Sequence, residues 1–419
     1  MPKIIFAAQH ASFDILRLTI MTTLRTRYNP AMTILPLESR LTALPPLALY
    51  IHIPWCVKKC PYCDFNSHTA RTALPETHYI EALTRDLESA LPLIWGRGIH
   101  SIFFGGGTPS LFSSEGIDAI LSMVRTLTKL DHFAEITLEA NPGTVEAKKF
   151  AGFKEAGVNR LSLGIQSFDA DHLRALGRIH DDREAHRAVE IAASTFDNFN
   201  LDLMYALPQQ TLQQAQHDVD TALSYAPPHL SCYHLTLEPN TPFHATPPAL
   251  PDDDLSADMQ LMIEATLTGA GYLHYETSAF AQPRRSCRHN LNYWQFGDYL
   301  GIGAGAHSKL SFHNRMLRQM RHKHPREYME HALAGNPIQH EHEITPVDLP
   351  FEFMMNALRL TDGFDTALFT ERTGLPIIAA QTALEEAERR SLIVRDHVRI
   401  TPTQTGQRFL NDLLGLFLP

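Results

Sequence analysis

The stretch Tyr50-Ile51-His52-Ile53-Pro54-Trp55-Cys56-Val57-Lys58-Lys59-Cys60-Pro61-Tyr62-Cys63-Asp64-Phe65 contains three of the five cysteines of the chain, at C-x3-C-x2-C spacing. Five cysteines placed at random along 419 residues would give this spacing on the order of 10⁻³ times, so it indicates a functional motif. Three thiolates this close together can hold a [4Fe–4S] cluster with one iron uncapped. An uncapped iron offers a position for an exchangeable ligand, as the open position of a catalytic metal site does.

Two other uses of the three thiols stay open on the residues alone. A closed zinc site needs four ligands, so it would require His52 or His68 beside the cysteines. Alternatively, the thiols are reduced and packed in a core. The tight spacing favours the iron–sulfur cluster over both.

The motif and the residues around it, Tyr50–Pro54 and Pro61–His68, resemble the radical S-adenosylmethionine (SAM) superfamily. Within it they are most similar to the oxygen-independent coproporphyrinogen III oxidase-like family and its heme chaperone branch. The resemblance implies that Cys56, Cys60 and Cys63 ligate a [4Fe–4S] cluster. It also implies that the free iron chelates the amino and carboxylate groups of SAM.

Composition describes an ordinary globular protein, with 44% hydrophobic and 20% charged residues. No apolar run reaches the ~18 residues that span a bilayer. A net charge of −10 argues against a protein whose surface as a whole binds nucleic acid. An odd number of cysteines, three of them clustered, favours a reducing compartment, so we expect a cytoplasmic protein. Cys232 and Cys287 are expected to be buried or free thiols.

The N-terminal segment differs from the rest. Residues 1–31 carry a charge of +3 and resemble a weak transit peptide, but we prefer a translation start at Met32 or a disordered tail. We expect four regions: an extension over 1–44, a radical SAM barrel over 45–240, an accessory region over 241–344 and a C-terminal domain over 345–419.

Short apolar runs alternate with helical patterns from Leu47 onward. The strands are expected at Leu47–Ile53, Ile99–Phe104, Glu135–Glu139, Arg160–Ile165, Phe199–Tyr205 and Leu230–Leu237. The helices are expected at Glu76–Ile94, Ser114–Lys129, Val145–Ala156, Asp181–Ala193 and Leu212–Tyr225. Six such units predict an α/β fold with right-handed crossovers and an open, partial (β/α)6 barrel. An α+β accessory region and a C-terminal winged-helix-like domain complete the predicted architecture.

Polar residues follow the predicted strands where each one ends. Ligands of barrel-type sheets bind at the carboxyl ends of the strands, and these residues suit the ammonium, hydroxyl and carboxylate groups of SAM. The Gly-rich loop Gly105–Pro109 follows the second strand, where glycines allow a close approach of the backbone to a ligand. The resemblance implies SAM contacts from Tyr50, Tyr62, Gly106, Gly107, Thr108, Glu139, Gln166, Arg178 and Asp202. No catalytic residue is assigned.

A second dense stretch, His289-Asn290-Leu291-Asn292-Tyr293-Trp294, matches the HNxxYW motif of the heme chaperone branch. A histidine can ligate heme iron and aromatic rings can stack on the macrocycle, so the resemblance implies heme binding by His289, Tyr293 and Trp294. A packed surface histidine is the alternative. Cys287 and His307 are weaker candidates as ligands. The Gly-rich stretch Gly297–Ser308 is compatible with a loop against a flat surface.

A basic run, Arg315, Arg318, Arg321, Lys323 and Arg326, is best explained as a solvated helix face, although it could meet heme propionates or an acidic partner.

The C-terminal region predicts a winged-helix-like module. Its elements are expected at Phe351–Leu360, Asp365–Arg372, Ile377–Arg389, Ile393–Arg395, Val398–Ile400 and Gly406–Leu418. From residue 346 onward the charge is −3, the wrong sign for a DNA-binding face. We therefore expect it to pack against the barrel or dock a partner.

One residue separates an enzyme from a chaperone. The decarboxylating branch of the family carries a fourth cysteine two positions after the third, where this chain has Phe65. A phenyl ring cannot replace a thiol in redox or ligand chemistry. We therefore expect a heme chaperone that binds the cluster, SAM and heme and passes heme to an acceptor protein. Radical SAM oxidation of coproporphyrinogen III is the alternative, and a respiratory or membrane-associated acceptor and a homodimer are left open.

Overall fold

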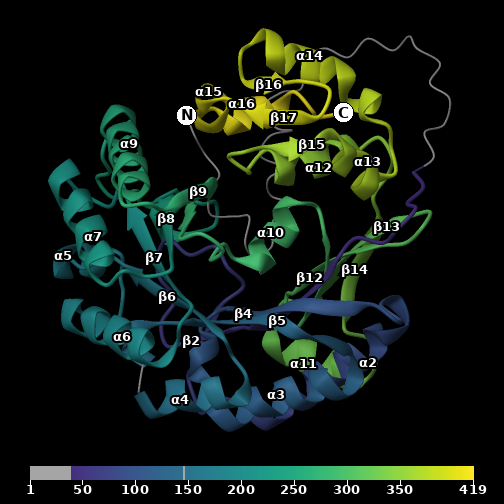
Figure 1. Ribbon diagram of the computed structural model, residues 1–419. Coiled ribbons are helices and arrows are strands. Elements are labelled where there is room, and N and C mark those ends of the chain that lie inside the picture. The colour runs from purple at the N-terminus through teal and green to yellow at the C-terminus, as the bar shows by residue number, and fades with distance from the viewer. Residues whose placement is uncertain (1–38, 145–146) are drawn as a thin grey trace.

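The computed structural model describes residues 39–144 and 147–419, so the interpretation of residues 1–31 lies outside the described residues. One mixed sheet dominates the chain (Figure 1). Its strand order is β14-β13-β12-β11-β1-β4-β5-β6-β7-β8-β10-β9. Among the described residues, no helix combines the length and the apolar character needed to cross a membrane.

The six predicted strands lie side by side and parallel, which confirms the α/β architecture. They are β1 (Leu47–Ile53), β4 (Gly98–Gly106), β5 (Lys129–Ala140), β6 (Arg160–Gln166), β7 (Phe199–Tyr205) and β8 (His229–His234). The helices that connect them are α2 (Glu76–Ala90), α3 (Ser114–Leu127), α4 (Ala147–Ala156), α5 (Ala170–Ala175), α6 (Asp182–Thr195) and α7 (Leu212–Ser224). These helices follow the outer face of the curved sheet (Figure 1).

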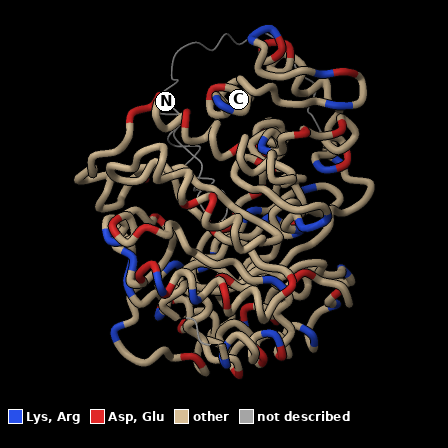
Figure 2. Tube along the Cα trace, turned by 60° about the vertical axis from the view of Figure 1, so that its left-hand side comes forward, with Lys and Arg blue, Asp and Glu red and all other residues tan. Residues whose placement is uncertain are grey.

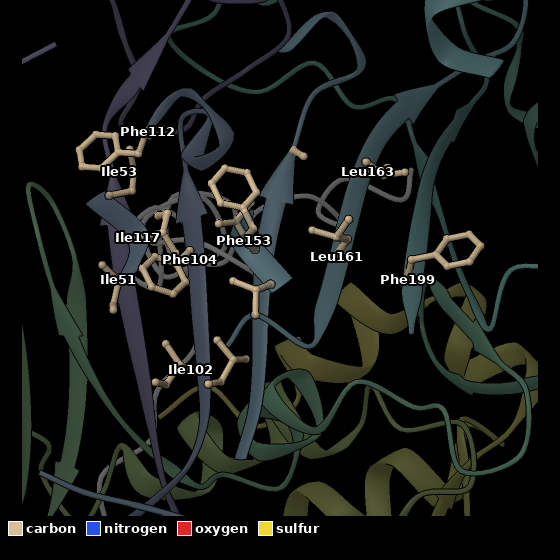
Figure 3. Packing of buried hydrophobic residues seen from close by; sticks show 14 of the residues in the cluster. Ile51, Ile53, Ile102, Phe104, Phe112, Ile117, Phe153, Leu161, Leu163 and Phe199 are labelled. Atoms are coloured by element: carbon tan, nitrogen blue, oxygen red, sulfur yellow. The ribbon is translucent and has the colours of Figure 1, made fainter. Parts of the chain in front are cut away.

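Side-chain alternation along the strands gives the sheet its two faces. In β4, Ile102 and Phe104 belong to the main apolar core between the sheet and the outer helices (Figure 3). Because neighbouring side chains of a strand point to opposite faces, Ser101 and Phe103 turn to the concave side. Both contact His289 of helix α10 (Arg288–Trp294), which therefore fills the concave side.

The strands of the second half extend the sheet at both edges. On one side lie β11 (Asp298–Ile302), β12 (His307–Ser311), β13 (Met316–Arg321) and β14 (Ile338–Glu343), and on the other lie β10 (Ala279–Ala281) and β9 (Leu273–Glu276). Strand β11 runs parallel to β1, and the others pair antiparallel with their neighbours. Helix α9 (Asp253–Gly269) packs against α7, and α11 (Pro325–Leu333) packs against α2.

Two predictions for this region are wrong. The Gly-rich stretch forms β11, a turn and the start of β12 instead of one loop. Glycine is needed because a Cβ at Gly301 would lie 2.1 Å from the backbone oxygen of His307. The basic run is not a solvated helix face: β13 buries Arg318 and Arg321, which pair with Glu352 and Asp86 from distant parts of the chain.

The C-terminal region forms helices around a small sheet, as predicted. Its helical elements are α12 (Leu349–Ala357), α13 (Thr366–Thr373), the 3-10 turn η4 (Ile377–Ala380), α14 (Gln381–Arg389), α15 (Gln404–Arg408) and α16 (Leu410–Gly415). Its strands, in sheet order, are β15 (Phe364–Asp365), β17 (Arg399–Pro402) and β16 (Ile393–Arg395). The single final helix that we expected is interrupted at Phe409. Charges of both signs are interspersed over this region and the outer helices (Figure 2).

Candidate functional site

The three motif cysteines lie on the loop after β1, beyond the carboxyl ends of the parallel strands. Cys56 ends the short strand β2 (Trp55–Cys56), which pairs with β3 (His68–Thr69), and Cys60 and Cys63 occupy the turn between them. All three side chains line one pocket. Its other lining residues are Lys58, Tyr62, Asp64, Phe65, Ser67, Gly106, Gly107, Thr108, Glu139, Ala140, Asn141, Ser162, Gly164, Gln166, Arg178, Asp202 and Tyr233.

This pocket brings together eight of the nine residues for which the family resemblance implies SAM contacts. The exception is Tyr50, which is buried, stacks on Phe103 at 6.4 Å between ring centroids, and hydrogen-bonds with its Oη to Nδ1 of His52 at 3.0 Å. Burial, then the nearby Glu139 carboxylate, raises the pKa of the Tyr50 phenol well above its ordinary value.

Each motif sulfur has a polar neighbour, and for Cys56 and Cys60 that neighbour comes from another segment of the chain. Thr108 donates from Oγ1 to Sγ of Cys56 across 3.5 Å, and Arg178 donates from Nη1 to Sγ of Cys60 across 3.7 Å. The Ser67 hydroxyl lies 3.9 Å from Sγ of Cys63. Hydrogen bonds to sulfur stabilise a thiolate, so the loop suits an anionic iron–sulfur ligand set.

Burial is the main cause of a raised pKa at two of the motif thiols. It raises the pKa of Cys56, and it raises the pKa of Cys63 to about 12. Ligating a metal ion requires thiolates, so its binding would release protons here. Among the described residues, no three His, Cys, Asp or Glu side chains gather closely enough for a single metal ion. Three cysteines around one pocket suit the [4Fe–4S] cluster that the sequence predicts.

The histidines of the zinc alternative have other partners. His52 is buried, and its Nδ1 contacts Oη of Tyr50. Its Nε2 lies 2.9 Å from the backbone oxygen of Asn66. His68 lies with Nε2 3.3 Å from Oδ1 of Asn66 and packs edge-on against His324. Neither ring is presented to the three sulfurs as a fourth ligand.

The Gly-rich loop closes one wall of the pocket. The backbone N–H of Gly107 donates to the oxygen of Ile53 at 2.7 Å, which ties the loop to β1. The N–H of Gly106 donates to Oε2 of Glu139 at 3.3 Å, and Gly106 has a φ of +111°. A Cβ at Gly106 would lie 2.4 Å from the His52 ring, so only glycine fits.

Asn141, for which we predicted no SAM contact, joins two parts of this wall. Its Oδ1 accepts from Nη2 of Arg178, and its Nδ2 donates to Oγ1 of Thr108 at 2.8 Å. Arg178 also donates to the backbone oxygen of Gly164 at 2.8 Å. The sequence signal was its position directly after the strand that ends in Glu139 and Ala140.

The pocket floor holds a carboxylate with a perturbed pKa. Asp202 accepts from Oγ of Ser162 at 2.9 Å and from Nδ2 of Asn200 at 2.8 Å. Burial, followed by repulsion from Glu139, raises the pKa of Asp202 to about 6. Ser162 and Asn200, which orient it, were not predicted because polar residues inside a strand carry no local signal.

Gln166 ends β6 with a left-handed φ of +70°, a conformation that non-glycine residues rarely adopt. Its Oε1 is buried and has no hydrogen-bond partner among the described residues. A buried acceptor without a partner is costly, so this atom points to a donor supplied by a ligand. The pocket can therefore receive a ligand that carries a hydrogen-bond donor, as SAM does.

The residues of the HNxxYW motif lie elsewhere, in α10 on the concave face of the sheet. His289 is 1% exposed, its Nδ1 lies 3.1 Å from Oγ of Ser101, and its Nε2 lies 3.2 Å from Oη of Tyr293. Trp294 is buried beneath the Arg359 guanidinium, 4.8 Å from ring centroid to Cζ. Both ring nitrogens of His289 are thus engaged, and heme ligation would require at least one of these contacts to break.

Comparisons with known proteins agree with this geometry. The sequence model of the radical SAM superfamily matches residues 50–222, and that of the HemN C-terminal domain matches residues 344–409. Heme chaperone HemW of Haemophilus influenzae is 49% identical over 90% of this chain and 98% of its own length. Heme chaperone HemW of Escherichia coli is 48% identical over 90% of this chain and 99% of its own. The same-named protein of Bacillus subtilis is 34% identical over 88% and 98%.

Among solved structures, coproporphyrinogen III oxidase (HemN) of Escherichia coli, described as a radical SAM enzyme, superposes with a TM-score of 0.76. The two chains share 23% sequence identity over 89% of this chain and 90% of the other. This likeness concerns the fold.

Proposed function

The chain belongs to the radical SAM superfamily and, within it, to the family of the curated heme chaperones, and from that premise we propose that it binds heme and transfers it to an acceptor protein. Membership implies a [4Fe–4S] cluster and SAM as cofactors. The observation that carries the proposal is the identity of 49% over nearly the whole length of a relative named for heme chaperone activity.

The cofactor pocket has the residues that the proposal needs. Cys56, Cys60 and Cys63 would supply the thiolates for the cluster. Glu139 and Asp202 would accept from the amino and hydroxyl groups of SAM, and the Gly-rich loop would let the methionine moiety approach the backbone. When bound, a cluster of this type supplies an open iron position and one-electron chemistry.

Phe65 favours carrier function over porphyrinogen oxidation. It lines the pocket beside the motif cysteines, at the position where the decarboxylating branch has its fourth cysteine. The phenyl ring offers neither a thiolate nor a proton at that position. The fold shared with coproporphyrinogen III oxidase does not bear on this difference.

Heme binding is the first test. Anaerobically purified protein should bind about one heme per chain by absorbance titration, and His289→Ala should weaken binding by at least about tenfold, the loss of roughly 1.4 kcal/mol. Ser101→Ala is the matched control, because it removes a hydrogen-bond partner of His289 and leaves the imidazole in place. Equal heme affinity of His289→Ala and the wild type would exclude His289 as the ligand.

Turnover is the second test and addresses the alternative function. Reduced, cluster-loaded protein supplied with SAM and coproporphyrinogen III should yield no protoporphyrinogen. Formation of that product at a rate above the background would establish the oxidase instead.

The ligand set is tested by replacing Cys56, Cys60 and Cys63 together with serine. The visible absorbance of the iron–sulfur cluster should disappear, and a double replacement of Cys232 and Cys287 by serine should leave it unchanged. Cys232 and Cys287 are buried and do not line the pocket, so a cluster that survives the triple replacement would refute the assignment.

A further inference from the structure

A chain of hydrogen bonds crosses the concave side of the sheet, from the cofactor pocket to helix α10. It begins at Asp202 on the pocket floor and ends at Cys287, the residue before the first turn of α10. Between them lie Asn200 of β7, His229 of β8 and Tyr275 of β9. The direction of each hydrogen bond follows from the chemistry of the groups.

The first link fixes the orientation of the Asn200 amide. Its Nδ2 donates to Oδ1 of Asp202 and to Oγ of Ser162, each at 2.8 Å, while Ser162 donates to Oδ2 of Asp202. Both amide protons are therefore used, and Oδ1 of Asn200 must accept from whatever it faces.

The second link fixes the tautomer of His229. Nδ1 of His229 lies 2.6 Å from Oδ1 of Asn200 and must donate to it. Burial lowers the pKa of His229 well below its ordinary value, so the ring is neutral and carries a single N–H. Nε2 therefore accepts, and its partner at 2.7 Å is Oη of Tyr275.

The third link reaches α10. Tyr275 donates its hydroxyl proton to His229, so its oxygen is available to accept, and the backbone N–H of Cys287 donates to it at 3.2 Å. Glu135 receives three further donors of this helix end. They are the Cys287 thiol at 3.5 Å and the N–H groups of Arg288 and His289 at 3.2 and 3.0 Å. Tyr275 and Glu135 thus hold the start of the helix that carries His289.

We propose that His229 and Tyr275 are positioning residues that couple ligand binding at Asp202 to the placement of helix α10. Every donor in the chain points toward Asp202. A ligand hydroxyl that donates to this carboxylate takes up part of its negative charge, which weakens its hydrogen bonds to Asn200 and Ser162. Asn200 and His229 are 2% and 0% exposed, so neither can turn to water when its bond weakens, and the adjustment passes to Tyr275 and Cys287.

The inference rests on the proposed function only for the ligands, SAM in the pocket and heme at α10. Two sites coupled in this way influence each other reciprocally, with factors of about 5 to 150 in affinity for typical systems. We expect SAM to change heme affinity by about tenfold, within that range, and heme to change SAM affinity by the same factor.

Tyr275→Phe tests the path because it removes one hydroxyl and keeps the ring. In the wild-type, cluster-loaded protein, saturating SAM should change the amide exchange rates of residues 287–294 by at least about threefold, because their local opening depends on how the start of α10 is held. In Tyr275→Phe this response should be lost, whereas SAM affinity should stay within about threefold of the wild type, since Tyr275 does not line the pocket.

Tyr272→Phe is the matched control. Tyr272 is a buried neighbour whose Oη donates to the backbone oxygen of Pro227 at 2.6 Å, outside the chain of hydrogen bonds. His229→Gln serves as a second variant, because an amide can donate on one side and accept on the other, and it should retain part of the response.

The outcomes separate the two proposals. An exchange response that is absent in the wild type, or that survives in Tyr275→Phe, overturns the coupling, and so does heme affinity that is independent of SAM. Loss of heme binding in all proteins with the exchange response intact would reject the heme chaperone function and leave the coupling standing.

Discussion

Arg178 donates a hydrogen bond from Nη1 to the sulfur of Cys60 across 3.7 Å, which links two residues 118 positions apart in the sequence. The same guanidinium donates through Nη2 to Asn141 and to the backbone oxygen of Gly164. One planar group therefore connects the cysteine loop with the ends of β5 and β6. Its geometry depends on the fixed fork of donors that only arginine has.

Arg178→Lys should weaken SAM binding by at least about tenfold, or roughly 1.4 kcal/mol. An ammonium group cannot serve three acceptors in one plane, so Asn141 and the cysteine loop lose their common support. The iron content should stay near that of the wild type, because the three thiols remain. Isothermal titration of SAM into anaerobic, cluster-loaded protein measures the affinity, and iron and sulfide assays measure the cluster.

The control for this variant is Arg174→Lys. Arg174 is exposed on α5 and pairs with the exposed Asp171, and pairs of this kind contribute little. Neither SAM affinity nor iron content should change. If Arg178→Lys also binds SAM as the wild type does, the guanidinium does not shape the pocket.

The parallel strands and the cysteine loop could be predicted because their signals are local. Apolar runs such as Phe199–Tyr205 are short, bounded by polar residues, and separated by amphipathic stretches of helical length. Since polar residues after parallel strands meet at one edge, the sequence alone was enough to expect Glu139, Gln166 and Asp202 near one another.

The features that could not be predicted from the sequence depend on contacts between residues that are distant along the chain. Arg321 pairs with Asp86 across 235 positions, so the basic run gave no sign that it would be buried in a strand. Ser162 and Asn200 lie within strands whose pattern is mainly apolar, and their role follows from facing Asp202 inside the barrel. The burial of His289 could not be predicted either, because it depends on α10 entering the concave side of the sheet.

SAM affinity should depend on pH through Asp202. The pKa of this carboxyl is about 6 in the free protein, and ribose hydroxyls donate to the ionised form. Below pH 6, SAM binding must therefore release the proton of Asp202, so SAM affinity should fall by about tenfold for each unit by which the pH is lowered. Above pH 7 the affinity should be constant. Titrations of the cluster-loaded protein between pH 5 and 7.5 measure this slope, and Asp202→Asn should flatten it.

Asp218 provides the control for the pH profile. Burial raises its pKa to about 6 as well, but its carboxylate accepts from Ser167 and Phe168 and does not line the pocket. Asp218→Asn should keep the slope below pH 6. A profile that is unaltered in Asp202→Asn would assign the proton to another group.

Gly106→Ala should lower SAM affinity by at least about tenfold. The added Cβ would lie 2.4 Å from the His52 ring, which cannot yield because Tyr50 and Asn66 hold its two nitrogens. The Gly-rich loop must then shift away from the cysteine loop. Titration of SAM into the variant measures the effect.

Gly335→Ala is the control for Gly106→Ala, because it introduces backbone strain without a steric collision. Gly335 has a φ of +82°, but no atom lies within 4 Å of a Cβ placed there. This variant should lose about 1–2 kcal/mol of stability from the left-handed conformation and keep its SAM affinity. A loss of SAM affinity in Gly335→Ala as large as that in Gly106→Ala would mean that the effect does not arise from the collision with His52.

Glu352→Gln should destabilise the protein by about 3 kcal/mol, because it leaves a buried cation without its counter-charge. Arg318 of β13 and Glu352 of α12 are 7% and 8% exposed and lie 2.6 Å apart, between Nη2 and Oε2, so the pair ties the sheet to the C-terminal domain. Urea unfolding under anaerobic conditions measures the change in the free energy of unfolding.

The exposed pair Arg326–Glu330 is the control, and Glu330→Gln should cost less than about 1 kcal/mol. If Glu352→Gln lowers the free energy of unfolding by as little as Glu330→Gln does, the C-terminal domain is held by its apolar contacts. In that case the hydroxyl of Tyr299, which lies 2.6 Å from Nη1 of Arg318, compensates the arginine sufficiently.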